Sequence, residues 1–102
     1  MKFKFLLFRK ELREKIKKIK LIVSDVDGVL TNGEIGYCNG ISGLKSFNVK
    51  DGLAVKLLQD NGISLALISG GASEATKLRA ESLLINECHT NIKNKLLTIA
   101  EI

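Results

Sequence analysis

The stretch LIVSDVDGVLTNG, residues 21–33, places two carboxylates, Asp25 and Asp27, directly after an apolar run. The run predicts a short strand over about residues 20–26, buried on both faces of a sheet. Carboxylates this close repel each other and are costly to desolvate, unless a cation or a substrate needs them there. The alternative is a strand that ends in an ordinary Asx-type turn. An EF-hand loop is excluded, because its further oxygen ligands and closing Glu are missing.

The composition is typical of one soluble globular domain. The 102 residues are 45% apolar and 26% charged, which suffices for one hydrophobic core. Cys38 and Cys88 lie far apart in the sequence, with no CxxC pairing and no His cluster nearby. This pattern favours reduced thiols and a cytoplasmic protein.

The net charge of +5 is concentrated at the N-terminus. Residues 1–20 hold nine Lys or Arg and two Glu, a net +7, whereas residues 21–102 hold seven basic and nine acidic residues, a net −2. Apolar residues at positions 5, 8, 12, 16 and 19 predict a basic amphipathic leader helix over residues 1–19, with one stripe packed on the domain. Binding to nucleic acid or to a membrane surface is the alternative for this segment. We expect no nucleic-acid partner and no stable membrane insertion, since no apolar run approaches the roughly 18 residues that span a bilayer.

The rest of the chain alternates between strand and helix patterns. Residues 31–48 carry four glycines and suit a β-hairpin or flap. A helix follows, with Leu53, Leu57 and Leu58 on one side and an Asn-Gly stop. A second apolar strand at 63–71, a helix capped by Ser73, a short strand near 84–88 and a helix from about 93 complete the pattern. This order predicts an α/β fold with a parallel sheet and right-handed crossovers.

Four side chains fall where an open α/β sheet binds its ligands, beyond the carboxyl ends of the strands. Asp25 could attack phosphorus, and Asp27 could protonate the leaving oxygen and later activate water. Ser69, the Gly70 N–H and Lys95 could hold the phosphate oxygens, with Mg²⁺ offsetting the crowded negative charge. Each of these residues alone is also compatible with an ordinary turn or surface position. Their joint occurrence at successive element boundaries favours phosphoryl transfer.

The motifs DVDGVLTNG, KSFNVKDGLAVKLL, LISG and NK, with the flap between the first two, resemble the haloacid-dehalogenase-like phosphatases. More narrowly, they resemble the capless 3-deoxy-D-manno-octulosonate 8-phosphate phosphatases of lipopolysaccharide sugar synthesis, over roughly residues 18–102. The resemblance implies a Rossmann-like parallel sheet with a β-hairpin flap after the first strand and no cap domain. It also implies magnesium-dependent hydrolysis of an acidic sugar phosphate through an aspartyl-phosphate. A homotetramer is implied as well, in which one subunit's flap helps to close a neighbour's site.

The resemblance assigns roles to individual residues. Asp25 would be the nucleophile and a magnesium ligand, and Asp27 would be the acid–base and would lend its main-chain carbonyl to the metal. The substrate loop and its basic contacts would be Asn48, Val49, Lys50, Asp51, Gly52, Lys56, Arg79 and Lys95.

The chain departs from the family pattern at two places, and both departures predict a lower phosphatase activity. The chain reads ISGG where the family usually reads ITGR, so Gly71 replaces a basic substrate contact. The family's fourth motif, an acid cluster that supplies another magnesium carboxylate, would come after Ile102 together with the final strands. We therefore expect a phosphatase domain over residues 20–102 that is incomplete at its C-terminus, with an exposed sheet edge and weak activity. The alternative is a non-catalytic remnant that binds sugar phosphate or co-assembles with a complete homologue.

Overall fold

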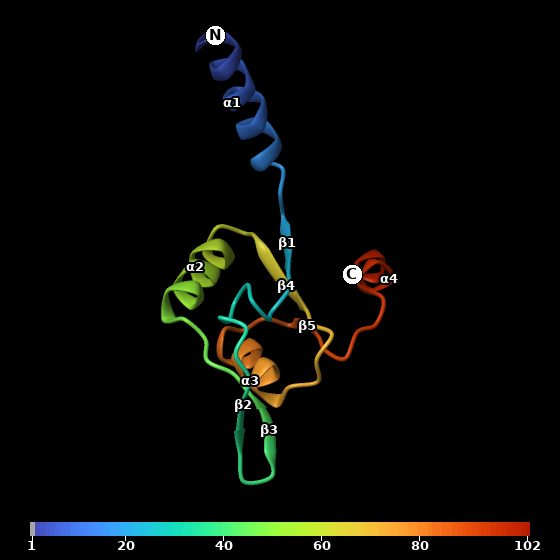
Figure 1. Ribbon diagram of the computed structural model, residues 1–102. Helices are drawn as coiled ribbons and strands as arrows, with labels where there is room; N and C mark the ends of the chain where they lie inside the picture. The colour runs from blue at the N-terminus through green and yellow to red at the C-terminus, as the bar shows by residue number, and fades with distance from the viewer. Residues whose placement is uncertain (1) are drawn as a thin grey trace.

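The computed structural model describes the backbone of residues 2–102 and the side chains of residues 8–40 and 43–102. Three strands follow the first helix, and helices and strands then alternate to the end of the described chain (Figure 1). In chain order they are α1 (Lys2–Ile16), β1 (Leu21–Ser24), β2 (Gly36–Cys38), β3 (Ile41–Leu44), α2 (Val49–Asp60), β4 (Ser64–Ile68), α3 (Glu74–Ser82), β5 (Glu87–His89) and α4 (Lys95–Glu101).

The main sheet has three parallel strands in the order β1-β4-β5, which confirms the predicted α/β fold. Leu65, Ala66, Leu67 and Ile68 of the central strand β4 are all buried. The strand β1, in contrast, is half-buried and Leu21 is exposed, so its predicted burial on both faces was wrong. The reason is its place in the sheet, because β4 is the one strand that pairs with β1 among the described residues.

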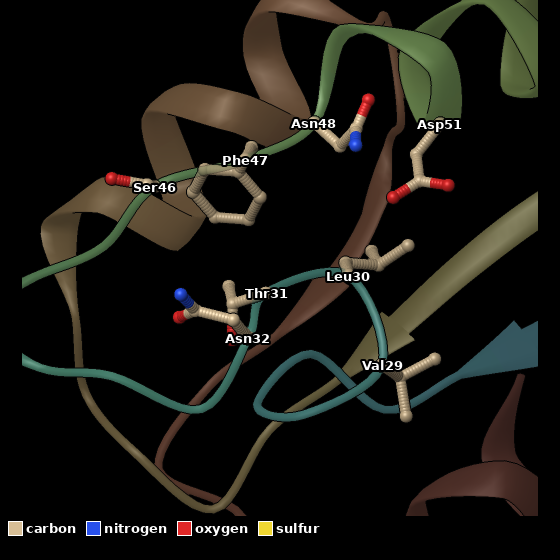
Figure 2. Close-up of a pocket in the computed structure, with 8 residues that line it drawn as sticks. All are labelled: Val29, Leu30, Thr31, Asn32, Ser46, Phe47, Asn48 and Asp51. Carbon is tan, nitrogen blue, oxygen red and sulfur yellow. The ribbon is translucent and has the colours of Figure 1, made fainter.

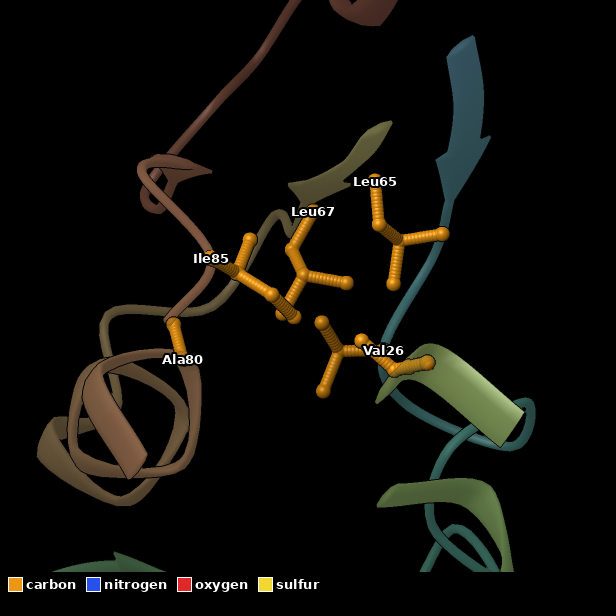
Figure 3. Close-up of a cluster of buried hydrophobic side chains, with 6 residues drawn as sticks. Val26, Leu65, Leu67, Ala80 and Ile85 are labelled. Carbon is orange, nitrogen blue, oxygen red and sulfur yellow. The ribbon is translucent and has the colours of Figure 1, made fainter. Parts of the chain in front are cut away.

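The core lies where the sheet meets α2 and α3 (Figure 3). Figure 3 shows Leu65 and Leu67 of β4 reaching toward Val26 and Ile85. Val55 and Ala80 complete the buried cluster from α2 and α3. Burying a Leu or Val side chain stabilises a fold by about 1.5–3 kcal/mol. Because Val26 is fully buried between the two acids, the core also fixes the backbone that carries them.

The buried face of α2 differs from the side on which its leucines gather. Leu53 and Leu57 are exposed, at 60% and 55%, whereas Gly52 and Val55 are buried. A Cβ at position 52 would lie 2.7 Å from Nη2 of Arg79. Glycine therefore allows this side of α2 to approach α3, and Leu53 and Leu57 lie on the solvent side of the helix, whereas Leu58 is partly buried.

The strands β2 and β3 form the predicted hairpin. They pair antiparallel, with Cys38 opposite Ile41. The turn residues Asn39 and Gly40 have φ of 26° and 80°, and positive φ at both central residues is characteristic of type I′ hairpins. The hydroxyl of Ser73, the N-cap of α3, donates a hydrogen bond of 2.6 Å to the Gly43 carbonyl. The hairpin is thus attached to the start of α3 as well as to its own flanking chain.

The helix α1 extends away from the rest of the molecule along the line of β1 (Figure 1). It ends at Ile16, and its described side chains are exposed, including Phe8 and Leu12. The predicted packing of this helix on the domain was therefore wrong, because residues 17–20 lead straight into β1 without a reversal that would return α1 to the sheet. Position 5 of the predicted stripe lies outside the described side chains, and Met1 lies outside the described residues. Among the described residues, no helix combines the length and the apolar character needed to cross a bilayer.

Candidate active site

The two acids lie in a turn that follows β1. The Val26 carbonyl accepts hydrogen bonds from the amides of residues 29, 30 and 31, at 3.2, 2.9 and 3.2 Å. Val26, between the two acids, is fully buried in the core. The side chains of Asp25 and Asp27 are 45% and 43% exposed. Both carboxylates thus reach solvent from the turn that follows β1.

Thr31 closes this turn. Its hydroxyl oxygen accepts hydrogen bonds of 3.2 Å from the amides of both Gly28 and Gly33, and the side chain is buried. The two glycines have φ of +78° and +87°, a region that side chains rarely adopt. Thr31 was not among the residues predicted from the sequence. A threonine between two glycines in a polar turn is the signal that could have identified it.

Each acid has a lysine partner from a distant part of the chain. Lys95 Nζ lies 3.3 Å from Oδ1 of Asp25, and Lys45 Nζ lies 2.7 Å from Oδ1 of Asp27. Lys95 is the first residue of α4, next to the N-cap Asn94. The sequence prediction included Lys95 but missed Lys45, which stands at the start of the KSFNVKDG motif. Lysines are too common for that position alone to have revealed the ion pair.

The turn after β4 lies beside the acids. Ser69 is buried, and its hydroxyl oxygen accepts a hydrogen bond of 3.2 Å from the Gly71 amide. A Cβ at Gly71 would lie 3.7 Å from Ser69 Oγ and 3.9 Å from Oδ2 of Asp27. A Cβ at Gly70 would lie 3.6 Å from the Ile92 carbonyl, in the loop that leads to α4. The structure therefore brings the turns after β1 and β4 together, as expected for the carboxyl ends of parallel strands.

The predicted substrate loop begins α2. Asn48 is its N-cap, and the side-chain oxygen accepts a hydrogen bond of 2.8 Å from the Lys50 amide. A pocket of about 400 Å³ lies between this loop and the turn after Asp27, and Figure 2 shows the residues that line it. Its lining residues are Val29, Leu30, Thr31, Asn32, Ser46, Phe47, Asn48 and Asp51. Of the predicted substrate contacts, Asn48 and Asp51 therefore line this pocket.

The other predicted substrate contacts lie differently. Val49, Lys50 and Lys56 are exposed. Arg79 reaches the loop from α3, where its Nη2 donates a hydrogen bond of 3.2 Å to the Asn48 carbonyl and its guanidinium lies 5.7 Å from the centre of the Phe47 ring. Gly52 is buried, and a Cβ at this position would contact the arginine. Arg79 thus supports the loop through its backbone.

The carboxylates are chemically suited to Mg²⁺. This cation prefers hard oxygen ligands and is commonly held by one or two carboxylates, with water and substrate phosphate filling its octahedron. Asp25 and Asp27 supply such oxygens at a half-exposed edge, where water and phosphate have access. Within the described part of the chain, no group of three or more His, Cys, Asp or Glu forms a closed metal site. These donors are therefore chemically suited to an open magnesium site, in which water and phosphate would fill the remaining positions.

The sequence and the fold of the chain were compared with those of known proteins. No family model matches the chain. Over 72 residues, the chain is 40% identical to the 3-deoxy-D-manno-octulosonate 8-phosphate phosphatase KdsC of Haemophilus influenzae, a match that covers 71% of this chain and 40% of that relative. It is 32% identical over 92 residues to KdsC of Escherichia coli strain B, covering 90% of this chain and 49% of that relative. The chain thus spans about half the length, or less, of these relatives.

Solved structures agree with the sequence relatives. The phosphatase of the same name from Moraxella catarrhalis, in complex with magnesium, phosphate and KDO, has a TM-score of 0.82 and 37% identity, covering 89% of this chain and 52% of that one. A Legionella pneumophila protein, described as a subfamily III A hydrolase of the HAD superfamily, has a TM-score of 0.87 and 35% identity. That match covers 97% of this chain and 54% of the Legionella chain. Over the part of these relatives that it matches, the chain belongs to the haloacid-dehalogenase (HAD) superfamily and is close to the 3-deoxy-D-manno-octulosonate 8-phosphate phosphatases.

Proposed function

We propose that the chain acts as a magnesium-dependent phosphatase on 3-deoxy-D-manno-octulosonate 8-phosphate (KDO 8-phosphate). The observation that carries this proposal is the pairing of Asp25 with Lys95, at 3.3 Å, beside a second acid and the buried Ser69 turn. A carboxylate next to a cation and hydroxyl that can hold phosphate is the arrangement that nucleophilic phosphoryl transfer requires. The names of the relatives, and the KDO and phosphate bound to the Moraxella protein, support this choice of substrate.

In the first step, a carboxylate oxygen of Asp25 attacks phosphorus and the bond from phosphorus to the sugar oxygen breaks. The electron pair of that bond goes to the sugar oxygen, which takes a proton from Asp27. Ser69, the Gly70 amide and Lys95 hold the phosphoryl oxygens during the transfer. Asp25 and the main-chain carbonyl of Asp27 would hold Mg²⁺, which would supply positive charge opposite the phosphoryl oxygens.

In the second step, water attacks the phosphorus of the aspartyl-phosphate at Asp25. Asp27 accepts the proton that the water loses, and the phosphorus–oxygen bond to Asp25 breaks. The free carboxylate of Asp25 and inorganic phosphate result. The sum of both steps is phosphate ester plus water giving sugar and phosphate.

The sugar part of the substrate lies against the start of α2 in this proposal. Asn48, Val49, Lys50, Asp51 and Gly52 form the contact loop, and Lys56 and Arg79 add positive charge for an acidic sugar. The chain would assemble as a homotetramer, in which the hairpin of a neighbouring subunit covers the sugar-binding side of the site. The enzyme would act in the cytoplasm, in lipopolysaccharide sugar synthesis. Residues 1–19 form a separate leader in this proposal.

Release of phosphate from KDO 8-phosphate by the full 102-residue chain, in the presence of Mg²⁺, tests the function. We expect hydrolysis of this ester at a higher kcat/KM than of glucose 6-phosphate, and its loss in Asp25→Asn. Binding of KDO 8-phosphate without phosphate release would instead favour a non-catalytic sugar-phosphate binder. That second candidate is motivated by the open carboxylate site, because no group of three or more His, Cys, Asp or Glu surrounds the acids in the described part of the chain.

A further inference from the structure

We infer that Lys45 is a positioning residue for Asp27, holding one oxygen of that carboxyl group and leaving the other for the departing alcohol. The inference rests on the proposed function, in which Asp27 is the acid–base. It concerns a hairpin residue that neither the sequence motifs nor the relatives' names assign to the site.

The burial of Lys45 distinguishes this ion pair from the other lysine pairs. The side chain of Lys45 is 4% exposed, and its Nζ lies 2.7 Å from Oδ1 of Asp27. The lysines that pair with Glu14, Glu74 and Asp25 are 70%, 52% and 44% exposed. A buried ammonium is rare without a partner, and removing the partner of a buried charge is far more costly than breaking a surface pair. The Lys45–Asp27 contact is therefore the pair best suited to hold a carboxylate in one orientation.

The backbone on both sides of this contact is fixed. Lys45 directly follows β3, the second strand of the hairpin. The carbonyl of Gly43, two residues earlier, accepts the 2.6 Å hydrogen bond from Ser73, which caps α3. On the other side, Val26 is buried in the core next to Asp27. Because both partners are anchored, the pair sets the direction of the Asp27 carboxyl group.

The two oxygens of Asp27 have different surroundings. Oδ1 is taken by Lys45, whereas Oδ2 lies 3.9 Å from the position of a Cβ at Gly71. Because position 71 has no side chain, this approach to Oδ2 stays open. Beside it is a cavity of about 370 Å³ between the hairpin and the turn before α3, and its lining includes Asp27, Lys45 and Gly71.

This asymmetry suits proton transfer to a leaving group. In the acid form of Asp27, Oδ1 is the carbonyl oxygen and accepts from the Lys45 ammonium, so that the proton resides on Oδ2. An acid that donates to the leaving oxygen must come within about 2.6–3.2 Å of it. Lys45 acts on the reaction through Asp27 and need not touch the phosphoryl group.

Leaving groups of different basicity separate this role from a purely structural one. A sugar phosphate needs a proton on its leaving oxygen, whereas 4-nitrophenyl phosphate releases a stable phenolate without one. We expect Lys45→Met to lower the single-turnover rate of phosphoryl transfer from KDO 8-phosphate by about a hundredfold or more, with little change for 4-nitrophenyl phosphate. Lys45→Arg, which keeps the positive charge, should restore much of the loss. Lys77→Met, which removes an exposed ion pair, is the matched control and should change neither rate. Equal losses on both substrates would overturn the inference.

A second measurement does not depend on turnover. Hydrogen exchange of the hairpin amides, residues 36–44, should be faster in Lys45→Met and in Asp27→Asn than in the parent chain. The double variant should add little to either single one, because both remove the same contact. Lys77→Met should leave these amides unchanged. Hairpin exchange unaffected by either single variant would refute the positioning role. If the parent hydrolyses neither ester, the proposed function fails, and the exchange result alone decides whether Lys45 and Asp27 are coupled.

Discussion

Lys95 Nζ lies 3.3 Å from Oδ1 of Asp25, although Asp25 follows β1 and Lys95 begins α4. Both side chains are close to half exposed, so this pair contributes at most about 1 kcal/mol to stability. The ion pair matters for function rather than for stability, because it places the positive charge of Lys95 beside the proposed nucleophile, where an incoming phosphate group would bind.

Replacing the nucleophile should remove turnover without unfolding the chain. Asp25→Asn keeps the shape of the side chain but lacks the charged oxygen that attacks phosphorus, so we expect kcat for KDO 8-phosphate to fall below about a tenth of the parent value. Circular dichroism should show the same helix content in both proteins. Asp60→Asn, at the far end of α2, serves as the control and should keep full activity. A variant at position 25 that retains more than this residual rate would exclude Asp25 as the nucleophile.

The positive charges near the substrate loop should favour acidic sugars. We expect Lys50→Ala and Arg79→Ala to raise KM for KDO 8-phosphate more than KM for the phosphate of a neutral sugar. The reason is that KDO 8-phosphate has a carboxylate, which would lose its contact with the removed positive charge, whereas a neutral sugar has none. Steady-state kinetics on both esters provide the measurement. Arg79→Ala should have the additional effect of loosening the loop, since it removes the 3.2 Å hydrogen bond to the Asn48 carbonyl. Equal changes on the two substrates would show that neither residue reads the carboxylate.

Magnesium and phosphate should bind cooperatively. With one carboxylate from Asp25 and the carbonyl of Asp27, most of the magnesium octahedron is left to water, and phosphate oxygens can replace some of that water. We expect the Kd for Mg²⁺ from isothermal titration calorimetry to fall at least about fivefold at saturating inorganic phosphate. Asp25→Asn should abolish this coupling. An unchanged Kd in the parent would mean that the two ligands do not share a site.

Two buried threonines should respond in opposite directions to the same substitution. Thr76 is 1% exposed, and its hydroxyl has no hydrogen-bond partner among the described residues. Thr76→Val removes an unsatisfied polar group, so we expect it to raise the free energy of unfolding by about 1 kcal/mol. Thr31→Val should lower it by about 1–3 kcal/mol, because the Gly28 and Gly33 amides lose their acceptor. Urea unfolding of the parent and both variants tests the pair, and a loss of stability in Thr76→Val would contradict the prediction.

The two cysteines should differ in reactivity. Cys38 is exposed in the hairpin, whereas Cys88 is partly buried in β5, and burial raises the pKa of the Cys88 thiol despite the opposing charge of Lys77. Alkylation requires the thiolate, so we expect iodoacetamide to modify Cys38 first and Cys88 more slowly. Mass spectrometry of peptides over a time course gives both rates. Cys38→Ser should leave only the slow reaction, and faster labelling at position 88 would contradict the burial argument.

Local features of the fold could be predicted because the responsible interactions lie within a few residues. Ser73 caps α3 through its own hydroxyl and the amide of Ala75, at 3.2 Å, as its place before the helix pattern indicated. Asn39 and Gly40 form the hairpin turn with positive φ, which these residue types tolerate. The motif after the first apolar run placed Asp25 and Asp27 beyond a parallel strand, and the structure and the relatives confirm that fold.

Contacts over long distances could not be predicted in the same way. The apolar run at β1 gave no sign that β4 would take the central position, since burial depends on strand order. The leucines of α2 gave no sign that Gly52 would face α3, because this follows from how closely two helices approach. Lys45 contacts Asp27 because the tertiary fold places the chain after β3 beside the turn after β1.

The sequence by itself determined the alternation of strands and helices, the caps and the two acids, because hydrophobic periodicity and side-chain chemistry act locally along the chain. Tertiary structure alone decided the projection of α1, the burial of β4 and the lysine assigned to each acid. These depend on which distant segments meet, and that is decided by the packing of the whole sheet around Val26 and its neighbours in the core.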